Sequence, residues 1–319
     1  MTRYSIRHRT FYRYGEKMSS GQSLGHLTLR TTPNQTVLAS SIAVDPVPED
    51  CTEWLDAFGN PVYSFTITAP HDTLEVVASS VVDVTVADMP SSDEPWERLM
   101  ARFSTGSSQR DIDAQQFVLP SPFIPYLFDL HALAKSAFTT GRPFFEAMRA
   151  LTESIYLDFS FDPGFSDVST PLGDVLLHRR GVCQDFAHLM TGALRSVGFA
   201  ARYVSGYIET DPPPGEAKLV GTDASHAWCS VYVPGIGWID SDPTNNQVPP
   251  YRHMTVAWGR DYGDVAPLRG VVLGPSASQE MKVEVDVVRV DSANGPIDMV
   301  PSDMVPTDVV PTDAPTEES

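Results

Sequence analysis

The stretch Arg180-Gly-Val-Cys-Gln-Asp-Phe-Ala-His-Leu-Met190 decides the fold of this chain. From Cys183 onward, apolar residues recur at helical spacing, at Phe186, Leu189, Met190, Ala193, Leu194 and Val197. Gly198 then supplies a stop signal, so the pattern predicts a helix with Cys183 in its first turn. Unpaired amides and the dipole at a helix N-terminus favour a thiolate, which is the reactive form of cysteine. A free cysteine is, however, often only a small buried hydrophobe, so its position alone does not establish a nucleophile.

Three β-strands are expected after this helix, at residues 200–207, 225–233 and 237–242, joined by Pro- and Gly-containing loops. Alternation in the second strand places His226, Trp228, Ser230 and Tyr232 on one face and Ala227, Cys229, Val231 and Val233 on the other. His226 is therefore the candidate proton acceptor for the thiol, and Cys229 is expected in the core. A histidine on a strand is more often a structural residue, so His226 alone proves no base.

A carboxylate that orients the imidazole would complete a thiol-based site, and the third strand offers Asp240 and Asp242 on the same face. Alternation leaves the choice between them open. Both could instead end the strand and cap the turn that Pro243 begins. The joint occurrence of Cys, His and Asp in this order nevertheless indicates covalent thiol catalysis.

At these residues the sequence resembles the transglutaminase-like superfamily. The matching motifs are Arg180-Gly-Val-Cys-Gln-Asp-Phe-Ala-His-Leu, Ser225-His-Ala-Trp and Gly237-Trp-Ile-Asp-Ser-Asp-Pro-Thr. The resemblance assigns the orienting carboxylate to Asp242 and thus implies a catalytic set of Cys183, His226 and Asp242. It also implies an α+β fold with a papain-like core, in which the nucleophile helix packs on an antiparallel sheet.

The chain divides by composition into three parts: an N-terminal antiparallel β domain over residues 1–88, a catalytic domain over 89–292 and a tail over 293–319. Short alternating segments, among them 26–30, define the first part, and the segment 54–60 resembles the β domain found before the catalytic domain in one bacterial branch of the family.

In the catalytic part we expect helices beginning near Trp96 and Phe144, and a strand over 281–290. Repeats of Val-Pro-Ser/Thr-Asp predict a disordered acidic tail.

Composition narrows the possible partners. Lys and Arg number 22 against 41 Asp and Glu, and the net charge of -19 disfavours nucleic acid and anionic membrane surfaces. The charged N-terminus is no secretory signal, and no stretch is long and apolar enough for a membrane helix, so we expect a cytoplasmic protein. The three cysteines are expected to be free thiols.

Other polar residues near the motifs have less certain roles. Asp185 is interpreted as complementing the helix dipole, and His188 as facing a domain contact without a catalytic role. Trp228 and Trp238 are candidates for an acyl-binding cleft, although an aromatic residue on a sheet is usually core. A metal site formed by Cys183, His188 and His226 lacks the spacing expected for zinc, and no calcium-loop motif occurs, so no metal or cofactor is expected.

The sequence therefore predicts an enzyme that attacks peptide or protein amides through a Cys183 thioester. A cysteine protease or amidase is favoured over a protein-glutamine transglutaminase, because nothing in the sequence indicates a second subsite for an amine. A module that binds peptides without turnover is the alternative from another class. The oligomeric state is left open.

Overall fold

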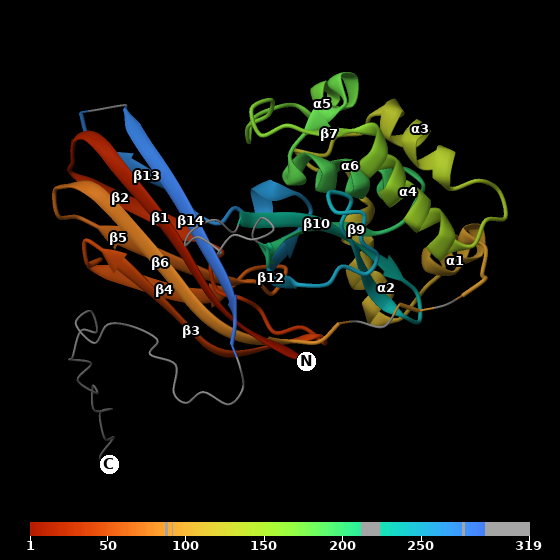
Figure 1. Cartoon of the computed structure of the whole chain (residues 1–319), viewed down its shortest axis with the longest axis horizontal. Coiled ribbons are helices and arrows are strands. Elements are labelled where there is room, and N and C mark those ends of the chain that lie inside the picture. Colours follow the sequence, from red (N-terminus) through yellow and green to blue (C-terminus); the bar gives the residue numbers. More distant parts are fainter. Residues whose placement is uncertain (87–88, 91, 212–223, 276–277, 291–319) are drawn as a thin grey trace, which may run out of the picture.

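The helix that begins at Cys183 packs against an antiparallel sheet in the computed structural model, which describes residues 1–86, 89–90, 92–211, 224–275 and 278–290. In Figure 1, helices gather at one end of the molecule and two large β-sheets at the other, with the sheet that contacts the helix between them. The fold is α+β, as the sequence predicted. None of the helices in the described part of the chain combines the length and apolar character of a transmembrane segment.

The central sheet has the strand order β11-β10-β9-β12. Its strands are β9 (Ala201–Ile208), β10 (Ala224–Val233), β11 (Gly237–Ser241) and β12 (His253–Gly259). The alternation in β10 predicts the packing correctly, because Cys229, Val231 and Val233 are buried in one core cluster with residues of α6 (Cys183–Ser196). Gly198 has a φ of +96° just beyond the helix, a conformation that favours glycine.

The other helices in the described part of the chain are α1 (Trp96–Ser104), α2 (Gln109–Gln115), η1 (Gln116–Val118), α3 (Phe128–Ala137), α4 (Phe144–Asp158), α5 (Leu172–His178) and the short η2 (Tyr262–Asp264), which follows β12. Helices α1, α3, α4 and α5 bury apolar residues in one core cluster with α6, whereas Ala114 of α2 and Phe117 of η1 belong to a separate cluster with Tyr232. The two-stranded pair β7 (Ser160–Phe161) and β8 (Arg180–Gly181) lies directly before α6. The helices expected to begin near Trp96 and Phe144 are thus confirmed.

The other two sheets pack around a core cluster that includes Tyr14, Phe65 and Val76. One sheet has the order β14-β1-β6-β3 and the other β13-β2-β5-β4. Their strands are β1 (Thr2–Met18), β2 (Ser20–Gly25), β3 (Gln35–Asp45), β4 (Asp50–Leu55), β5 (Pro61–Ile67), β6 (His71–Val84), β13 (Arg269–Leu273) and β14 (Gln279–Arg289).

The end of the described chain returns to the N-terminal sheets. β14 pairs with β1 over eleven register positions, from Tyr4↔Arg289 to Tyr14↔Gln279, and β13 pairs with β2. The predicted division placed residues 269–289 with the catalytic part, whereas their hydrogen bonds join them to β1 and β2. The predicted acidic tail, residues 293–319, lies outside the described residues.

Residues 26–30 do not form the strand that their alternation suggested. Leu27 and Leu29 are buried, but the backbone of Arg30 bonds to Thr255 of β12 rather than to a neighbouring N-terminal strand. Apolar alternation here therefore reflects a segment packed between the two halves of the molecule.

The central sheet contacts the N-terminal strands directly. A buried cluster joins Tyr4 and Ile6 of β1 to Tyr203 and Tyr207 of β9. A hydrogen bond of 2.8 Å between His8 Nδ1 and the Tyr207 hydroxyl crosses the same contact. Residues from both halves of the chain therefore pack against the central sheet, which carries the candidate site.

Candidate active site

Cys183 is the first residue of α6 and is partly exposed, whereas Cys51 is exposed and Cys229 is buried; all three are free thiols. The turn that precedes Cys183 is held by Asp185, whose carboxylate accepts hydrogen bonds from Val182 N at 2.8 Å and from Ser166 Oγ at 2.5 Å. A Cβ on Gly181 would lie 2.6 Å from Asp185 Oδ2, so this turn requires a glycine. Asp185 therefore caps the helix and fixes the backbone at the thiol, a more specific role than complementing the dipole.

His226 on β10 and Asp242, just past the end of β11, form a buried pair. His226 Nε2 lies 2.8 Å from Asp242 Oδ2, and the two residues are 7% and 0% exposed. Burial by itself lowers the pKa of His226, but the hydrogen bond and charge of Asp242, with a smaller effect of the nearby Cys183 sulfur, raise this pKa to about 10. The structure thus brings Cys183, His226 and Asp242 together.

Asp240, the other carboxylate that alternation left open, bonds elsewhere. Its Oδ2 accepts a hydrogen bond of 3.1 Å from Trp228 Nε1. The strand register explains the difference, because Asp240 pairs with Ser230 and Ser241 with Cys229, which places Asp242 nearer to His226.

Asp242 is held by an unusually complete set of donors. Oδ1 accepts the backbone N–H groups of Thr244 at 2.9 Å and Asn245 at 3.2 Å, and Oδ2 accepts Asn245 Nδ2 at 2.7 Å in addition to His226. Burial alone would raise the pKa of Asp242, but the charges and hydrogen bonds of His226 and His253 hold it well below its usual range. The carboxylate is therefore ionised, fixed in position and unable to serve as an acid.

His253, the first residue of β12, was missed by sequence reasoning. Its Nε2 lies 2.9 Å from the same Asp242 Oδ2, and its Nδ1 lies 2.7 Å from the Tyr251 carbonyl oxygen. His253 therefore links the Tyr251 carbonyl to the Asp242 carboxylate. The available signal was a histidine at the start of the strand-like run His253-Met-Thr-Val-Ala-Trp.

His226, Asp242 and His253 are also the group within the described chain whose side-chain donors could converge on a metal ion, with ligand atoms within 4.8 Å of one another. Two imidazoles and a carboxylate suit zinc by chemical type. Each of these atoms already bonds to another member of the group, and Cys183 and His188 are not part of it. The arrangement is that of a hydrogen-bond network around Asp242.

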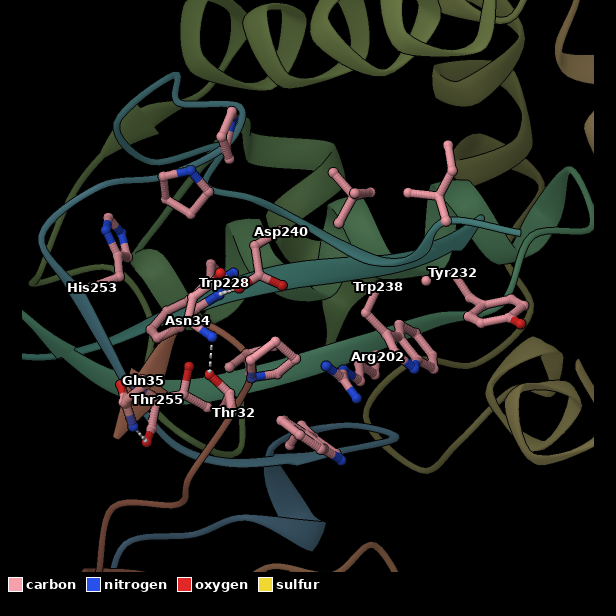
Figure 2. A pocket seen from close by; sticks show the side chains of 18 of the residues that line it. Thr32, Asn34, Gln35, Arg202, Trp228, Tyr232, Trp238, Asp240, His253 and Thr255 are labelled. Atoms are coloured by element: carbon pink, nitrogen blue, oxygen red, sulfur yellow. Dashed lines mark hydrogen bonds between the residues drawn. The ribbon is translucent and has the colours of Figure 1, made fainter. Parts of the chain in front are cut away.

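The remaining predicted residues take clear positions. His188 is buried and its Nε2 accepts a hydrogen bond of 3.1 Å from Tyr262 N, so it contacts η2, and burial lowers its pKa to about 3. Trp228 and Trp238 line a cavity on the face of the sheet that also carries His226 (Figure 2). A Cβ on Gly206, opposite His226 on β9, would lie 2.7 Å from the Trp228 ring, so glycine makes room for this indole.

Comparison with known proteins agrees with this architecture. Residues 4–83 match the bacterial transglutaminase-like N-terminal region, and residues 131–243 match the transglutaminase-like superfamily. An uncharacterized protein of Mycobacterium tuberculosis is 40% identical over 297 residues, which cover 90% of this chain and 92% of that protein. An uncharacterized protein of Mycobacterium leprae is 32% identical and covers 91% of this chain and all of its own length.

A crystal structure from Cytophaga hutchinsonii, named a "Putative Cysteine Protease", shares the fold with a TM-score of 0.72 at 22% identity, covering 92% of this chain and 93% of its own. The match to the superfamily core defines the class of protein, a family of thiol-dependent hydrolases and acyltransferases. The chain belongs to the transglutaminase-like superfamily, with the bacterial N-terminal region preceding its core.

Proposed function

We propose that this protein is a thiol-dependent amidase or protease that cleaves peptide or protein amides through a thioester on Cys183. The observation that carries the proposal is the buried His226–Asp242 pair, 2.8 Å apart, near Cys183 at the start of α6. Because the pKa of His226 is raised to about 10, the imidazole is protonated at neutral pH and stabilises a neighbouring thiolate.

In the first half-reaction the Cys183 sulfur attacks the amide carbonyl carbon, a C–S bond forms and the carbonyl oxygen takes the negative charge. Nε2 of His226 is bonded to Asp242, so Nδ1 is the nitrogen left to face the thiol and to protonate the departing amine. The C–N bond then breaks and leaves a thioester. In the second half-reaction, neutral His226 removes a proton from water, which attacks the thioester and releases a carboxylic acid and the Cys183 thiolate.

Backbone amides at the start of α6 supply the natural site for the oxyanion. The first turn of a helix leaves its N–H groups without intrahelical partners, and Cys183 and Gln184 occupy that turn. Val182 N is already bonded to Asp185, which fixes the direction of the next amides. The cap at Asp185 therefore contributes to catalysis by holding the backbone.

A protein-glutamine transglutaminase is the second candidate. A 96-residue segment is 40% identical to a Pseudomonas aeruginosa protein named Protein-glutamine gamma-glutamyltransferase, covering 28% of this chain and 14% of that protein. The two candidates share the thioester and differ in whether water or an amine resolves it. A module that only binds peptides would require no reactive thiolate. The cytoplasmic location remains a prediction.

Alkylation tests the shared step. The protein and its His226→Gln variant are incubated with iodoacetamide between pH 5 and 9, and labelling of each cysteine is followed by peptide mass. We expect Cys183 to react well below pH 8, with Cys51 as the exposed reference and Cys229 as the buried one. The variant should lose this advantage at Cys183 and keep the rate at Cys51.

Equal labelling of Cys183 and Cys51 at every pH would overturn the nucleophile and favour the binding module. If Cys183 is reactive, a glutamine-containing peptide incubated with and without a primary amine separates the two enzymes. Hydrolysis to glutamate or peptide cleavage supports the amidase or protease, whereas incorporation of the amine supports the transglutaminase.

A further inference from the structure

A second site lies beside the catalytic residues, on the outer face of the central sheet. A cavity of about 960 Å³ opens between this face, η1 and the N-terminal loops near Gln35 and Phe58. Its volume is at the upper end of the range of small-molecule sites, roughly 300–1,000 Å³. Cys183, His226 and Asp242 do not line it, whereas Trp228, which contacts His226, and His253, which contacts Asp242, do.

The floor of the cavity holds a buried cation. Arg202 of β9 is 7% exposed, and its Cζ lies 4.1 Å from the ring centroid of Trp238 and 3.6 Å from that of Trp258. Figure 2 shows its guanidinium beside the Trp238 indole, pointing into the cavity. The guanidinium thus lies over two indole rings.

Arg202 has no hydrogen bond or ion pair within the described ranges of the chain, and its Nε is a buried donor without a partner. Ser230, which pairs with Arg202 in the sheet register, likewise has an unpartnered buried Oγ. The nearest compensating carboxylate, Asp240, acts on Arg202 only through its charge, since its Oδ2 bonds to Trp228 Nε1. A buried guanidinium without its hydrogen bonds is costly, and a bound anion would remove that cost.

A second arginine, Arg30, adds to the positive potential near Arg202. Arg30 also lies over the Trp258 ring, 3.2 Å from its centroid, and bonds to Asn60 Oδ1 and the Phe58 carbonyl rather than to a carboxylate. Burial lowers the pKa of Arg202 to about 9, which still leaves it protonated at neutral pH. Two cations thus lie over the Trp258 indole, which lines the cavity.

We propose that this cavity binds a small organic carboxylate, with the planar carboxylate group on the edge of the Arg202 guanidinium and an apolar body against the aromatic lining. A carboxylate matches the in-plane fork of a guanidinium with two parallel hydrogen bonds. Phe117, Trp228 and Tyr232 supply apolar contact area for the rest of the ligand. This site is independent of the thioester chemistry proposed for Cys183.

Benzoate is the probe, with benzamide as its neutral isostere and inorganic phosphate as a tetrahedral anion. Three of the five tryptophans line the cavity, so intrinsic fluorescence reports binding, and calorimetry gives the dissociation constant. We expect saturable benzoate binding at about 1 mM or tighter, and at least tenfold weaker binding of benzamide and phosphate. Benzoate should also raise the melting temperature of the protein.

Arg202→Met should weaken benzoate binding at least about tenfold. Arg110→Gln removes an exposed arginine from the rim of the same cavity and should change binding less than about twofold, which controls for diffuse charge. If Arg202→Met does not fold by circular dichroism, Arg202→Lys keeps the charge but loses the fork, and should bind benzoate at least threefold more weakly than the wild type.

Benzamide or phosphate binding as tightly as benzoate, or no saturable benzoate binding below roughly 10 mM, would overturn the proposal. So would equal benzoate affinity in the wild type and the folded Arg202 variant. None of these measurements depends on turnover. The carboxylate site at Arg202 can therefore be refuted while the proposed amidase activity stands, and the amidase activity can be refuted while the carboxylate site stands.

Discussion

Replacing Asp242 with Asn should abolish the raised proton affinity of His226. The change keeps the shape of the side chain but removes the charge 2.8 Å from His226 Nε2. The rise in the pKa of His226 from 6.5 to about 10 corresponds to roughly 5 kcal/mol, at about 1.4 kcal/mol per pH unit. Coulomb attraction at 2.8 Å with an effective dielectric constant near 20 gives about 6 kcal/mol, so Asp242 is the main source of the rise, which burial opposes and Cys183 increases.

Without Asp242, burial dominates and the pKa of His226 should fall below its ordinary 6.5. Long-range ¹H–¹⁵N correlation spectra of ¹⁵N-histidine, recorded between pH 5 and 11, follow the ring directly. Iodoacetamide labelling of Cys183 near pH 6 should fall at least tenfold in the same variant, because neutral imidazole no longer supports the thiolate.

Asp240→Asn is the matched control. It removes a carboxylate two residues away from Asp242, and this carboxylate accepts a hydrogen bond from Trp228 rather than from His226. It should leave the pKa of His226 within about one pH unit of the wild type, because a charge without direct contact acts only through a screened field. The reasoning is refuted if the folded Asp242→Asn protein keeps a His226 pKa above 9, or if both substitutions lower it equally.

Three further substitutions test the surroundings of the site. Gly206→Ala would place a Cβ 2.1 Å from the Met254 carbonyl oxygen and should cost about 2 kcal/mol or more in denaturant unfolding, whereas Gly173→Ala, with open space around it, should cost nothing; similar values would contradict the packing. His188 has a pKa lowered from 6.5 to about 3, so the unfolded chain binds its proton first and stability is lost as the pH falls from 6.5 toward 3, by about 1.4 kcal/mol per pH unit. His188→Gln, which can still accept from Tyr262 N, should flatten that slope in urea titrations, and unchanged slopes would exclude the assignment. His253→Phe removes a donor from Asp242 and should raise the pKa of His226 further, so a fall measured by NMR would count against the shared carboxylate.

The helix at Cys183 and its sheet could be predicted because their signals are local. Apolar spacing in α6 and alternation in β10 each extend over consecutive residues, and the buried faces follow from that spacing. The choice between Asp240 and Asp242 could not be made in this way, because both lie on one face of the strand. Register decides it, and register depends on which residues of β10 and β11 pair.

Pairing between strands that are far apart in the sequence explains the other features that could not be predicted from the sequence. The segment of β14 was predicted as a strand from its own alternation, but its partner β1 is at the opposite end of the chain. His253 lies on β12, which joins the sheet beyond β9, so its approach to Asp242 depends on a strand order that periodicity does not encode. The cavity at Arg202 escaped prediction for the same reason, since it combines β9, β11 and β12 with loops of the N-terminal half.

The sharing of the Asp242 carboxylate between His226 and His253 also affects how readily His226 can release and regain its proton during the reaction. A base works best when its pKa lies near the working pH, because it must both give a proton to the departing amine and take one from water. In the structure Asp242 accepts five hydrogen bonds, and its Oδ2 is shared by His226, His253 and Asn245 Nδ2. An Asp242 bonded to His226 alone would hold the imidazolium still more tightly. Each additional donor disperses the charge of Asp242 and weakens its attraction for the proton on His226. We infer that His253 balances two needs of the site, a carboxylate that stays ionised without solvent and an imidazolium that can still release its proton.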